Sequence, residues 1–215
     1  MKCHALIVAA VLALAGCGQA GPSAPPTAEA PSVAASSARP AVATSTPATS
    51  AADTMARYDG YGDLRFGMDE AAFEKASFNK ASSNKASFNK AWSGELKGAP
   101  EQGSTCFYKT PAWVKSPKDF AFMFEAGHFV RYDVGSAKEL APGGGKVGMD
   151  EAQIRALYGT RVEAQPHKYV DGAKYLRIAA PQGDGVLLFE TDEHGKVTRW
   201  RMGVPPQVDY VEGCG

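Results

Sequence analysis

The chain has 215 residues, with 23 basic and 23 acidic side chains and a formal charge of zero. This length is enough for one medium-sized domain or two small ones. The balanced charge excludes the simplest argument for nucleic-acid binding, which needs a basic excess or stripe, so we expect no nucleic-acid partner.

The first residues have the pattern of an export signal, predicted here as residues 1–16. Lys2 supplies a positive start, an apolar run follows from residue 5 to residue 15, and small residues come next. The run is much shorter than the roughly 20 residues of a membrane-spanning helix. Leu14-Ala15-Gly16-Cys17 resembles the lipobox of bacterial lipoproteins, which implies cleavage before Cys17 and attachment of acyl chains such as palmitate to it. The alternative is an ordinary signal peptide with a chance cysteine.

The anchor determines the expected location. Two or more acyl chains on Cys17 hold a protein on a membrane essentially permanently, at about 0.8 kcal/mol per buried methylene. Gly18, rather than an aspartate, follows the cysteine, which in enterobacteria implies sorting to the outer membrane. We therefore expect a lipid-anchored protein of the cell envelope, on the outer membrane and facing the periplasm.

Residues 17–56 are predicted to form a disordered linker. They consist mainly of Ala, Pro, Ser and Thr, with almost no charged or aromatic side chain. Such a segment cannot bury enough apolar area to offset the entropy cost of ordering. The folded part then divides into a predicted repeat 1, residues 57–137, and a predicted repeat 2, residues 138–215.

Cysteine usage predicts one disulfide. Cys3 leaves with the signal peptide and Cys17 carries lipid, so Cys106 and Cys214 remain. In an oxidising compartment such a pair is expected to form a disulfide, which would join the end of the chain to repeat 1. Two free buried thiols are the alternative.

Repeat 1 is predicted to contain a strand, a helix and three further strands. Residues 61–66 have the pattern of a short strand. Residues 68–75 have the pattern of a helix, with Asp69 and Glu70 in its first turn, where the helix dipole favours acids. Further strands are expected at residues 104–110, 120–125 and 129–134, the last two with alternating apolar side chains.

A pentapeptide expansion, residues 76–90, interrupts the helix of repeat 1. It creates a Ser-x-x-Lys spacing three times, which is the spacing of nucleophile and base in penicillin-binding enzymes. The repetition itself generates this spacing, and the accompanying Ser-Asp-Asn and Lys-Thr-Gly motifs are absent from the sequence. We expect a projecting helical extension or a mobile loop, without catalytic function.

Repeat 2 follows a Pro-Gly-Gly-Gly breaker at residues 142–145. Residues 149–158 have the pattern of a short amphipathic helix, and Gly159 is well placed to end it. Strands are expected at residues 174–179, 186–191 and 196–202, the last two as a hairpin.

The two halves match each other. Gly-Met-Asp-Glu-Ala occurs at Gly67 and again at Gly148, and residues 122–125 match residues 187–190. Once the expansion is removed, the spacing between these motifs agrees within one residue. The predicted fold class is therefore α+β: two tandem repeats, each with one or more helices packed on a three- to four-stranded antiparallel sheet.

Residues 147–159, Val-Gly-Met-Asp-Glu-Ala-Gln-Ile-Arg-Ala-Leu-Tyr-Gly, resemble the Gly-Met helix of the small BamE/SmpA lipoproteins of the outer-membrane barrel-assembly machinery. Residues 187–201 resemble the closing strands of that family. Tandem copies of such a unit look like the β-lactamase inhibitory protein, whose doubled sheet forms a concave binding surface. The resemblance implies a fold and carries over neither a partner nor an inhibitory loop.

The sequence contains no catalytic or metal-binding pattern. His128, His167 and His194 have no partner at ligand spacing. Asp184, and the acids at residues 192 and 193, lack the twelve-residue calcium-loop pattern and fit turn chemistry better. We predict no catalytic residue, no metal, no cofactor and no enzymatic activity.

The remaining candidate is a binding face. If Tyr132 and Trp200 face the core, the opposite sheet face carries the following side chains: Phe129, Arg131, Asp133, Val197, Arg199 and Arg201. Arginine mixed with apolar groups is typical of recognition sites. The alternative is a solvated face with cross-strand ion pairs.

We expect a non-catalytic protein-binding or assembly module with a partner in the envelope. The alternative function is carbohydrate or peptidoglycan binding, with Trp92, Trp113 or Tyr169 as stacking platforms.

Overall fold

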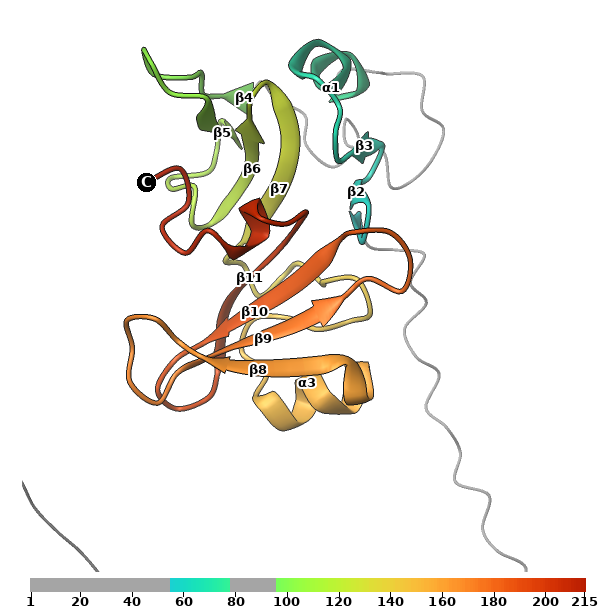
Figure 1. The fold of residues 1–215 in the computed structure, drawn as a ribbon, viewed down its shortest axis with the longest axis vertical. Helices are drawn as coiled ribbons and strands as arrows, with labels where there is room; N and C mark the ends of the chain where they lie inside the picture. The colour runs from blue at the N-terminus through green and yellow to red at the C-terminus, as the bar shows by residue number, and fades with distance from the viewer. Residues whose placement is uncertain (1–54, 78–95) are drawn as a thin grey trace, which may run out of the picture. The chain divides into compact units, whose positions relative to one another are not determined.

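One antiparallel sheet of eight strands runs through the folded part of the chain (Figure 1). The structure is a computed structural model that describes residues 55–77 and 96–215. The predicted signal peptide, Cys17, almost all of the linker, Trp92 and residues 78–90 of the expansion lie outside the described residues, so predictions about them stay predictions.

The strand order of this sheet is β4-β5-β6-β7-β11-β10-β9-β8. Each half of the chain contributes four consecutive strands, and the two sets meet where β7 pairs with β11. The strands are β4 (Leu96–Lys97), β5 (Cys106–Pro111), β6 (Phe120–Glu125), β7 (His128–Val134), β8 (Val162–Pro166), β9 (Lys174–Ala179), β10 (Val186–Thr191) and β11 (Val197–Gly203).

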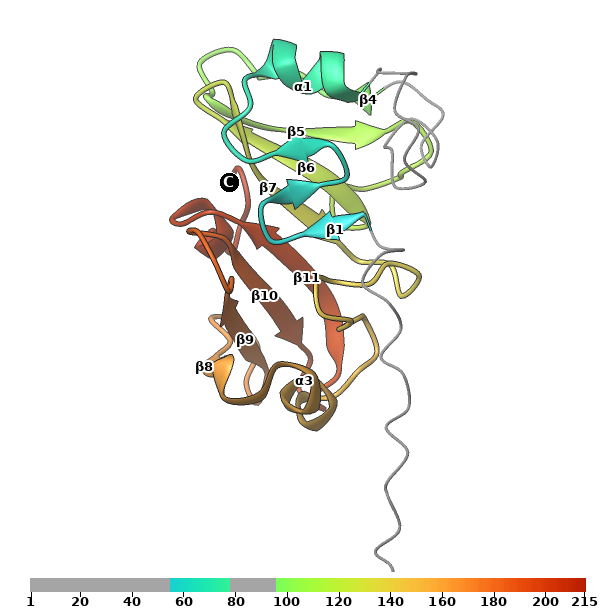
Figure 2. The ribbon, with the colours of Figure 1, turned by 90° about the vertical axis from the view of Figure 1, so that its right-hand side faces the viewer.

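The remaining elements are short. Two α-helices and a three-stranded sheet lie on the face of the large sheet that we call the inner face (Figure 2). The helices are α1 (Glu70–Ser77) and α3 (Glu151–Tyr158), the small strands are β1 (Ala56–Arg57), β2 (Gly60–Tyr61) and β3 (Leu64–Arg65), and the 3-10 turns are η1 (Gly159–Arg161) and η2 (Gln207–Asp209).

The predicted α+β class, with two tandem repeats on separate sheets, is wrong. The described residues are mostly β, with one continuous eight-stranded sheet and two α-helices of eight residues each. The two predicted sheets form a single sheet because β7 and β11 pair antiparallel, from Arg131 opposite Gly203 to Val134 opposite Trp200. The predicted boundary at residues 137 and 138 falls in the loop after β7, and the sheet continues across it.

The predicted first strand, residues 61–66, is also divided. Gly62 has a positive φ of 58°, which turns the chain between β2 and β3. The two pieces pair with each other antiparallel, Tyr61 opposite Leu64. Both side chains are fully buried, so this small sheet acts as a cover for the inner face.

Aromatic side chains form the core between the inner face and the elements that cover it. The alternation predicted for β6 is present, and Phe120, Phe122 and Phe124 all belong to the main core cluster. Phe73 of α1 meets Phe122 and Phe124 edge to face, with ring centroids 5.3 and 4.8 Å apart. Full burial of one such side chain stabilises the fold by about 1.5–3 kcal/mol. Ile154 of α3 has the same role in the second half and is fully buried.

A bulge in β7 changes which side chains face the core. Met123 of β6 pairs with Arg131, whereas the next residue, Phe124, pairs with Phe129. Val130 is therefore an extra residue without a partner on β6. Because alternation restarts across a bulge, Phe129 and the later core residues of β7 point to the same face.

The same irregularity occurs in β11. Glu190 of β10 pairs with Arg199, whereas Thr191 pairs with Val197, so Thr198 is the extra residue. Phe129 and Val197 therefore both lie in the main core. Their predicted place on the opposite face is wrong, because a strict period of two does not allow for a bulge.

The repeated Gly-Met-Asp motif makes the same contacts twice. In the first half, the Gly67 N–H donates to the Phe129 carbonyl at 2.8 Å and the Phe129 N–H donates to the Met68 carbonyl at 2.9 Å. The Asp69 side chain then accepts a hydrogen bond from the Ala72 N–H at 2.7 Å, which satisfies a free donor of the first helical turn.

In the second half, the Gly148 N–H donates to the Val197 carbonyl and the Val197 N–H to the Met149 carbonyl, both at 2.8 Å. The Asp150 side chain accepts from the Gln153 N–H at 2.9 Å. The motif thus fixes each helix start to the strand that carries the bulge.

We predict that Gly67→Ala and Gly148→Ala destabilise the fold to a similar extent. Their φ angles are 86° and 91°, and a Cβ at either position meets no atom within 4 Å. The cost is therefore conformational, about 1–2 kcal/mol for each variant. Urea unfolding measures it, and Gly67→Asn, which tolerates positive φ better, should lose less. Wild-type stability in both Ala variants would contradict the assigned role of the motif.

Candidate functional site

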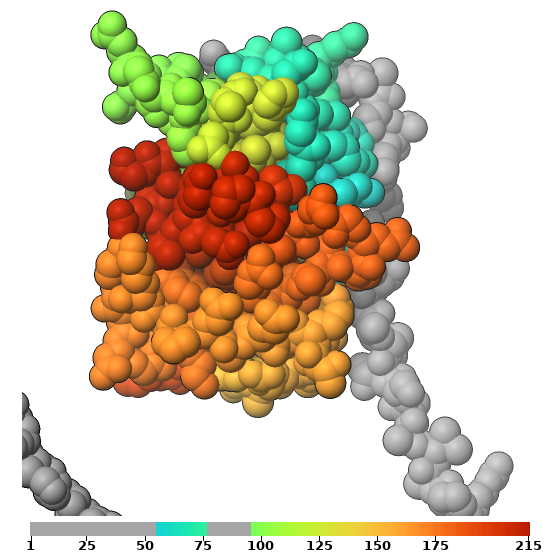
Figure 3. All heavy atoms as spheres, in the orientation of Figure 1, coloured from blue at the N-terminus to red at the C-terminus, as the bar shows by residue number. Residues whose placement is uncertain are grey.

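A C-terminal strap, residues 204–215, crosses the face of the sheet opposite the helices, which we call the outer face (Figure 3). Val208 is its central anchor and is fully buried. It belongs to a second, smaller core cluster with Tyr175, Val186 and Leu188, against which Val211 packs. The strap therefore closes an apolar area that the outer face would otherwise expose.

A disulfide ties the end of the strap to the first half of the chain. Cys106 at the start of β5 is bonded to Cys214, with Cα atoms 5.3 Å apart and a sequence separation of 108. The pairing predicted from cysteine usage is thus present in the structure.

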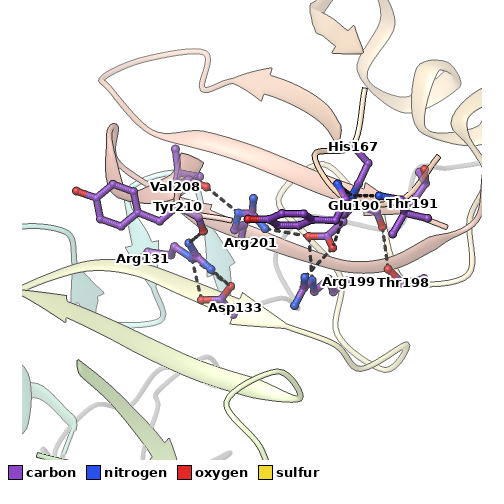
Figure 4. Close-up of polar contacts among 12 residues, drawn as sticks. Arg131, Asp133, His167, Glu190, Thr191, Thr198, Arg199, Arg201, Val208 and Tyr210 are labelled. Carbon is purple, nitrogen blue, oxygen red and sulfur yellow. Dashed lines mark hydrogen bonds and ion pairs between the residues drawn. The ribbon is translucent and has the colours of Figure 1, made fainter. Parts of the chain in front are cut away.

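Two arginines hold the backbone of the strap. The Arg131 Nη1 donates to the carbonyls of Gln207 at 3.0 Å and Tyr210 at 2.7 Å. The Arg201 Nε donates to the Val208 carbonyl at 2.7 Å. These guanidinium groups satisfy carbonyls that have no strand partner (Figure 4).

These arginines belong to a larger group that we call the charged cluster: Arg131, Asp133, His167, Glu190, Arg199 and Arg201 (Figure 4). Within it, Arg131 and Asp133 form a buried pair, with Nε–Oδ2 at 2.9 Å and Nη2–Oδ1 at 2.6 Å. Burial alone would lower the pKa of Arg131, but the charge of Asp133 and its hydrogen bonds outweigh burial and raise the pKa.

Glu190 is the centre of the second half of the cluster. Its Oε1 accepts from Arg199 Nη2 at 2.6 Å and faces His167 Nε2 at 3.0 Å. Its Oε2 accepts from Arg199 Nε at 2.9 Å and Arg201 Nη1 at 3.1 Å. Burial alone would raise the pKa of Glu190, but the hydrogen bonds from Arg199 and His167 and the two guanidinium charges lower it to about 2.

The tautomer of His167 follows from its contacts. Its Nδ1 accepts hydrogen bonds from the backbone N–H groups of Tyr169 at 3.0 Å and Val170 at 3.1 Å. The ring proton therefore lies on Nε2, which donates to Glu190. The ring also stacks on Tyr175 with centroids 4.6 Å apart, so His167 connects the loop between β8 and β9 to the cluster.

The chemistry of this arrangement favours fixed charge over proton transfer. A carboxylate with a pKa of about 2 is ionised near neutral pH and, with four hydrogen bonds, is a poor general base. The guanidinium groups stay charged. The cluster is therefore suited to holding the strap and neighbouring surface residues in place.

The structure places the residues of the predicted binding face in three different settings. Phe129 lies in the core. Arg131, Asp133 and Arg201 lie on the outer face, but they are buried under or beside the strap. Only Arg199 reaches the surface, with 30% of its side chain exposed.

Sequence reasoning missed Glu190, His167 and the strap. One signal was available for Glu190, because it matches Glu125 between the halves, and Glu125 accepts a hydrogen bond from Gln207 of the strap. No periodicity marks His167. The apolar residues of the strap stand among glycines, prolines and acids, without strand or helix spacing.

Among residues 55–77 and 96–215, no group of three or more His, Cys, Asp or Glu side chains is placed to hold a metal. Within the same ranges, no helix is long and apolar enough to cross a membrane.

Comparison with known proteins identifies no family. No protein-family model matches the chain, and no curated protein matches its sequence. The crystal structure of the uncharacterized protein YfeY from Escherichia coli is 14% identical, covers 70% of this chain and 99% of that chain, and has a TM-score of 0.43. An extracellular protein containing an SCP domain from Bacillus anthracis str. Ames is 10% identical, covers 75% of this chain and 49% of that chain, and has a TM-score of 0.38. At such TM-scores neither likeness bears on function, and the resemblance to BamE/SmpA stays a prediction.

We predict that stability falls in acid as Glu190 protonates. Its pKa is about 2 in the folded chain, against 4.5 ordinarily, so its contribution is complete above pH 4.5 and is lost as the pH falls toward 2. This pKa shift corresponds to about 3 kcal/mol of unfolding free energy. Unfolding free energies measured across this pH range test it.

The unfolding free energy of the matched variant Glu190→Gln should be about 3–5 kcal/mol lower at neutral pH, because two guanidinium groups are left without their carboxylate. Its remaining stability should depend less on pH between 4.5 and 2. Glu163→Gln, at an exposed position on β8, is the control. An unchanged acid profile in Glu190→Gln would contradict the assigned role.

We also predict that the Cys106→Ser, Cys214→Ser double variant is less stable by about 2–5 kcal/mol. The disulfide closes a long loop and fixes the end of the strap, so its loss raises the entropy of the unfolded chain. A reductant should cause the same loss in the wild type and no further loss in the double variant. Equal stability of the wild type with and without reductant would contradict this prediction.

Proposed function

We propose that the chain is a lipid-anchored, non-catalytic protein-binding module of the bacterial cell envelope. The lipobox-like Leu14-Ala15-Gly16-Cys17 supports a membrane anchor at Cys17, with the folded part in the periplasm at the outer membrane. The long linker, with few charged side chains, supports a module that extends from the membrane toward an envelope protein partner.

The proposed contact surface is a recognition patch made of Tyr169, Val170 and Arg199. Tyr169 is 58% exposed and Val170 is 39% exposed, and 30% of the Arg199 side chain is exposed. Tyrosine and arginine are the residue types that most often carry binding energy at protein interfaces. Arg199 is the residue that this patch shares with the binding face predicted from the sequence.

The observation that carries the proposal is that the patch is held rigid from below. The backbone N–H groups of Tyr169 and Val170 donate to His167. His167 and Arg199 in turn bind the same buried carboxylate, that of Glu190. A surface loop whose backbone is fixed before a partner arrives loses less entropy on binding.

Capture of partners by crosslinking in cells tests the proposal. Tyr169→Ala should lower the yield of the crosslinked partner about tenfold, since a central tyrosine contributes on the order of 2 kcal/mol. Its unfolding midpoint should fall little, because the hydrogen bond that the Tyr169 hydroxyl donates to Glu212 lies at the exposed surface. The matched control is Leu157→Ser, which removes a 45% exposed apolar side chain from α3 and should capture the partner normally. Equal capture by Tyr169→Ala and the wild type would contradict the proposal.

One observation favours the carbohydrate alternative. Trp113, in the loop after β5, is 65% exposed, as a stacking platform for a sugar ring requires. Co-sedimentation of the full chain with purified peptidoglycan sacculi tests this, with Trp113→Ala as the variant that should lose retention. No retention of the wild type would dismiss it.

A further inference from the structure

A cavity of about 330 Å³ opens on the outer face beside the strap. The recognition patch does not take part in it. Strands β8 to β11 form its floor, and the strap forms one wall. Its lining residues are Gln165, Pro166, Tyr175, Arg177, Leu188, Arg201, Asp209 and Val211.

Two hydrogen-bond donors at this cavity are unused. The Arg201 Nε and Nη1 bind the strap and Glu190, but none of the hydrogen bonds of the described residues involves Nη2. Arg177 touches Asp209 only at 3.3 Å through Nε and 3.5 Å through Nη2. Its Nη1 has no partner among the described residues.

The region also has one positive charge in excess. The charged side chains that line the cavity are two guanidinium groups and one carboxylate, those of Arg177, Arg201 and Asp209. An uncompensated charge in a buried setting is costly. In keeping with this, burial first and the charge of Arg131 second lower the pKa of Arg201. One further negative charge would balance the site.

The rest of the lining restricts the ligand. Leu188 and Val211 belong to the apolar cluster beneath the strap, and Pro166 and the Tyr175 ring add further apolar wall. The volume is at the small end of the range for ligand pockets, about 300–1,000 Å³. A hydrated inorganic ion would leave this apolar surface unused.

We propose that this cavity binds a small organic carboxylate. The carboxylate lies between Arg177 Nη1 and Arg201 Nη2, and a short apolar group lies against Leu188 and Val211. Two charge-assisted hydrogen bonds to planar guanidinium groups match the geometry of a carboxylate. The carboxylate belongs either to a free small acid or to the C-terminal residue of a short peptide.

NMR titration of the isotope-labelled full chain tests the proposal. The probes are isobutyrate and its neutral counterpart isobutyramide, and N-acetyl-alanyl-alanine and its C-terminal amide. The amide signals of Leu188 and Val211 are the readout, in a buffer without carboxylates. The proposal expects saturable shifts with at least one acid and none with the amides, and the tighter acid distinguishes the free acid from the peptide.

Two variants locate the site. Arg177→Gln should weaken binding of the acid about tenfold, the effect of losing one charge-assisted hydrogen bond. Arg161→Gln, at an exposed arginine outside the cavity, should bind as the wild type does. Equal shifts with acids and amides, no saturable shift with either acid, or wild-type affinity in Arg177→Gln would overturn the proposal. The recognition patch is tested separately by protein capture.

Discussion

The structure depends on the pairing of β7 with β11. This pairing joins strands from the two halves into one sheet and brings Asp133 opposite Arg201 at the centre of the outer face. Charged side chains at the middle of a sheet need a cover or partners. The strap supplies the cover, and its carbonyls accept hydrogen bonds from Arg131 and Arg201. The strap, which belongs to the second half, therefore also binds Arg131 of the first half, and the disulfide fixes the end of the strap there.

The charged cluster connects this architecture to function. Two guanidinium groups hold Glu190 ionised, so this carboxylate is a poor proton acceptor near neutral pH. The role of the cluster is structural. It holds the loop before β9, the strap and Arg199 in one arrangement. The proposed recognition patch and the proposed carboxylate cavity both depend on that arrangement, the first through His167 and the second through Arg201. Binding at a rigid surface fits these contacts better than catalysis does.

Local structure could be predicted from the sequence, and long-range pairing could not. Strands β9 and β10 lie at the predicted residues, and Phe122 and its neighbours face the core as alternation requires. Phe129 was misplaced because a bulge shifts the alternation, and no residue type marks that bulge. The fold class was wrong because nothing in β7 or β11 specifies which edge each one pairs with. Arg131 and Arg201 were assigned to an exposed face because the strap that buries them has no periodic pattern.

Native-state hydrogen exchange tests the central claim, that the β7–β11 pairing makes the two halves one cooperative unit. The account predicts that amides of Tyr132 and Arg201, in the two paired strands, exchange only through global unfolding. Their opening free energy should therefore equal the free energy of unfolding from denaturant. Exchange of these amides well below the global value, with one half opening while the other stays protected, would contradict it.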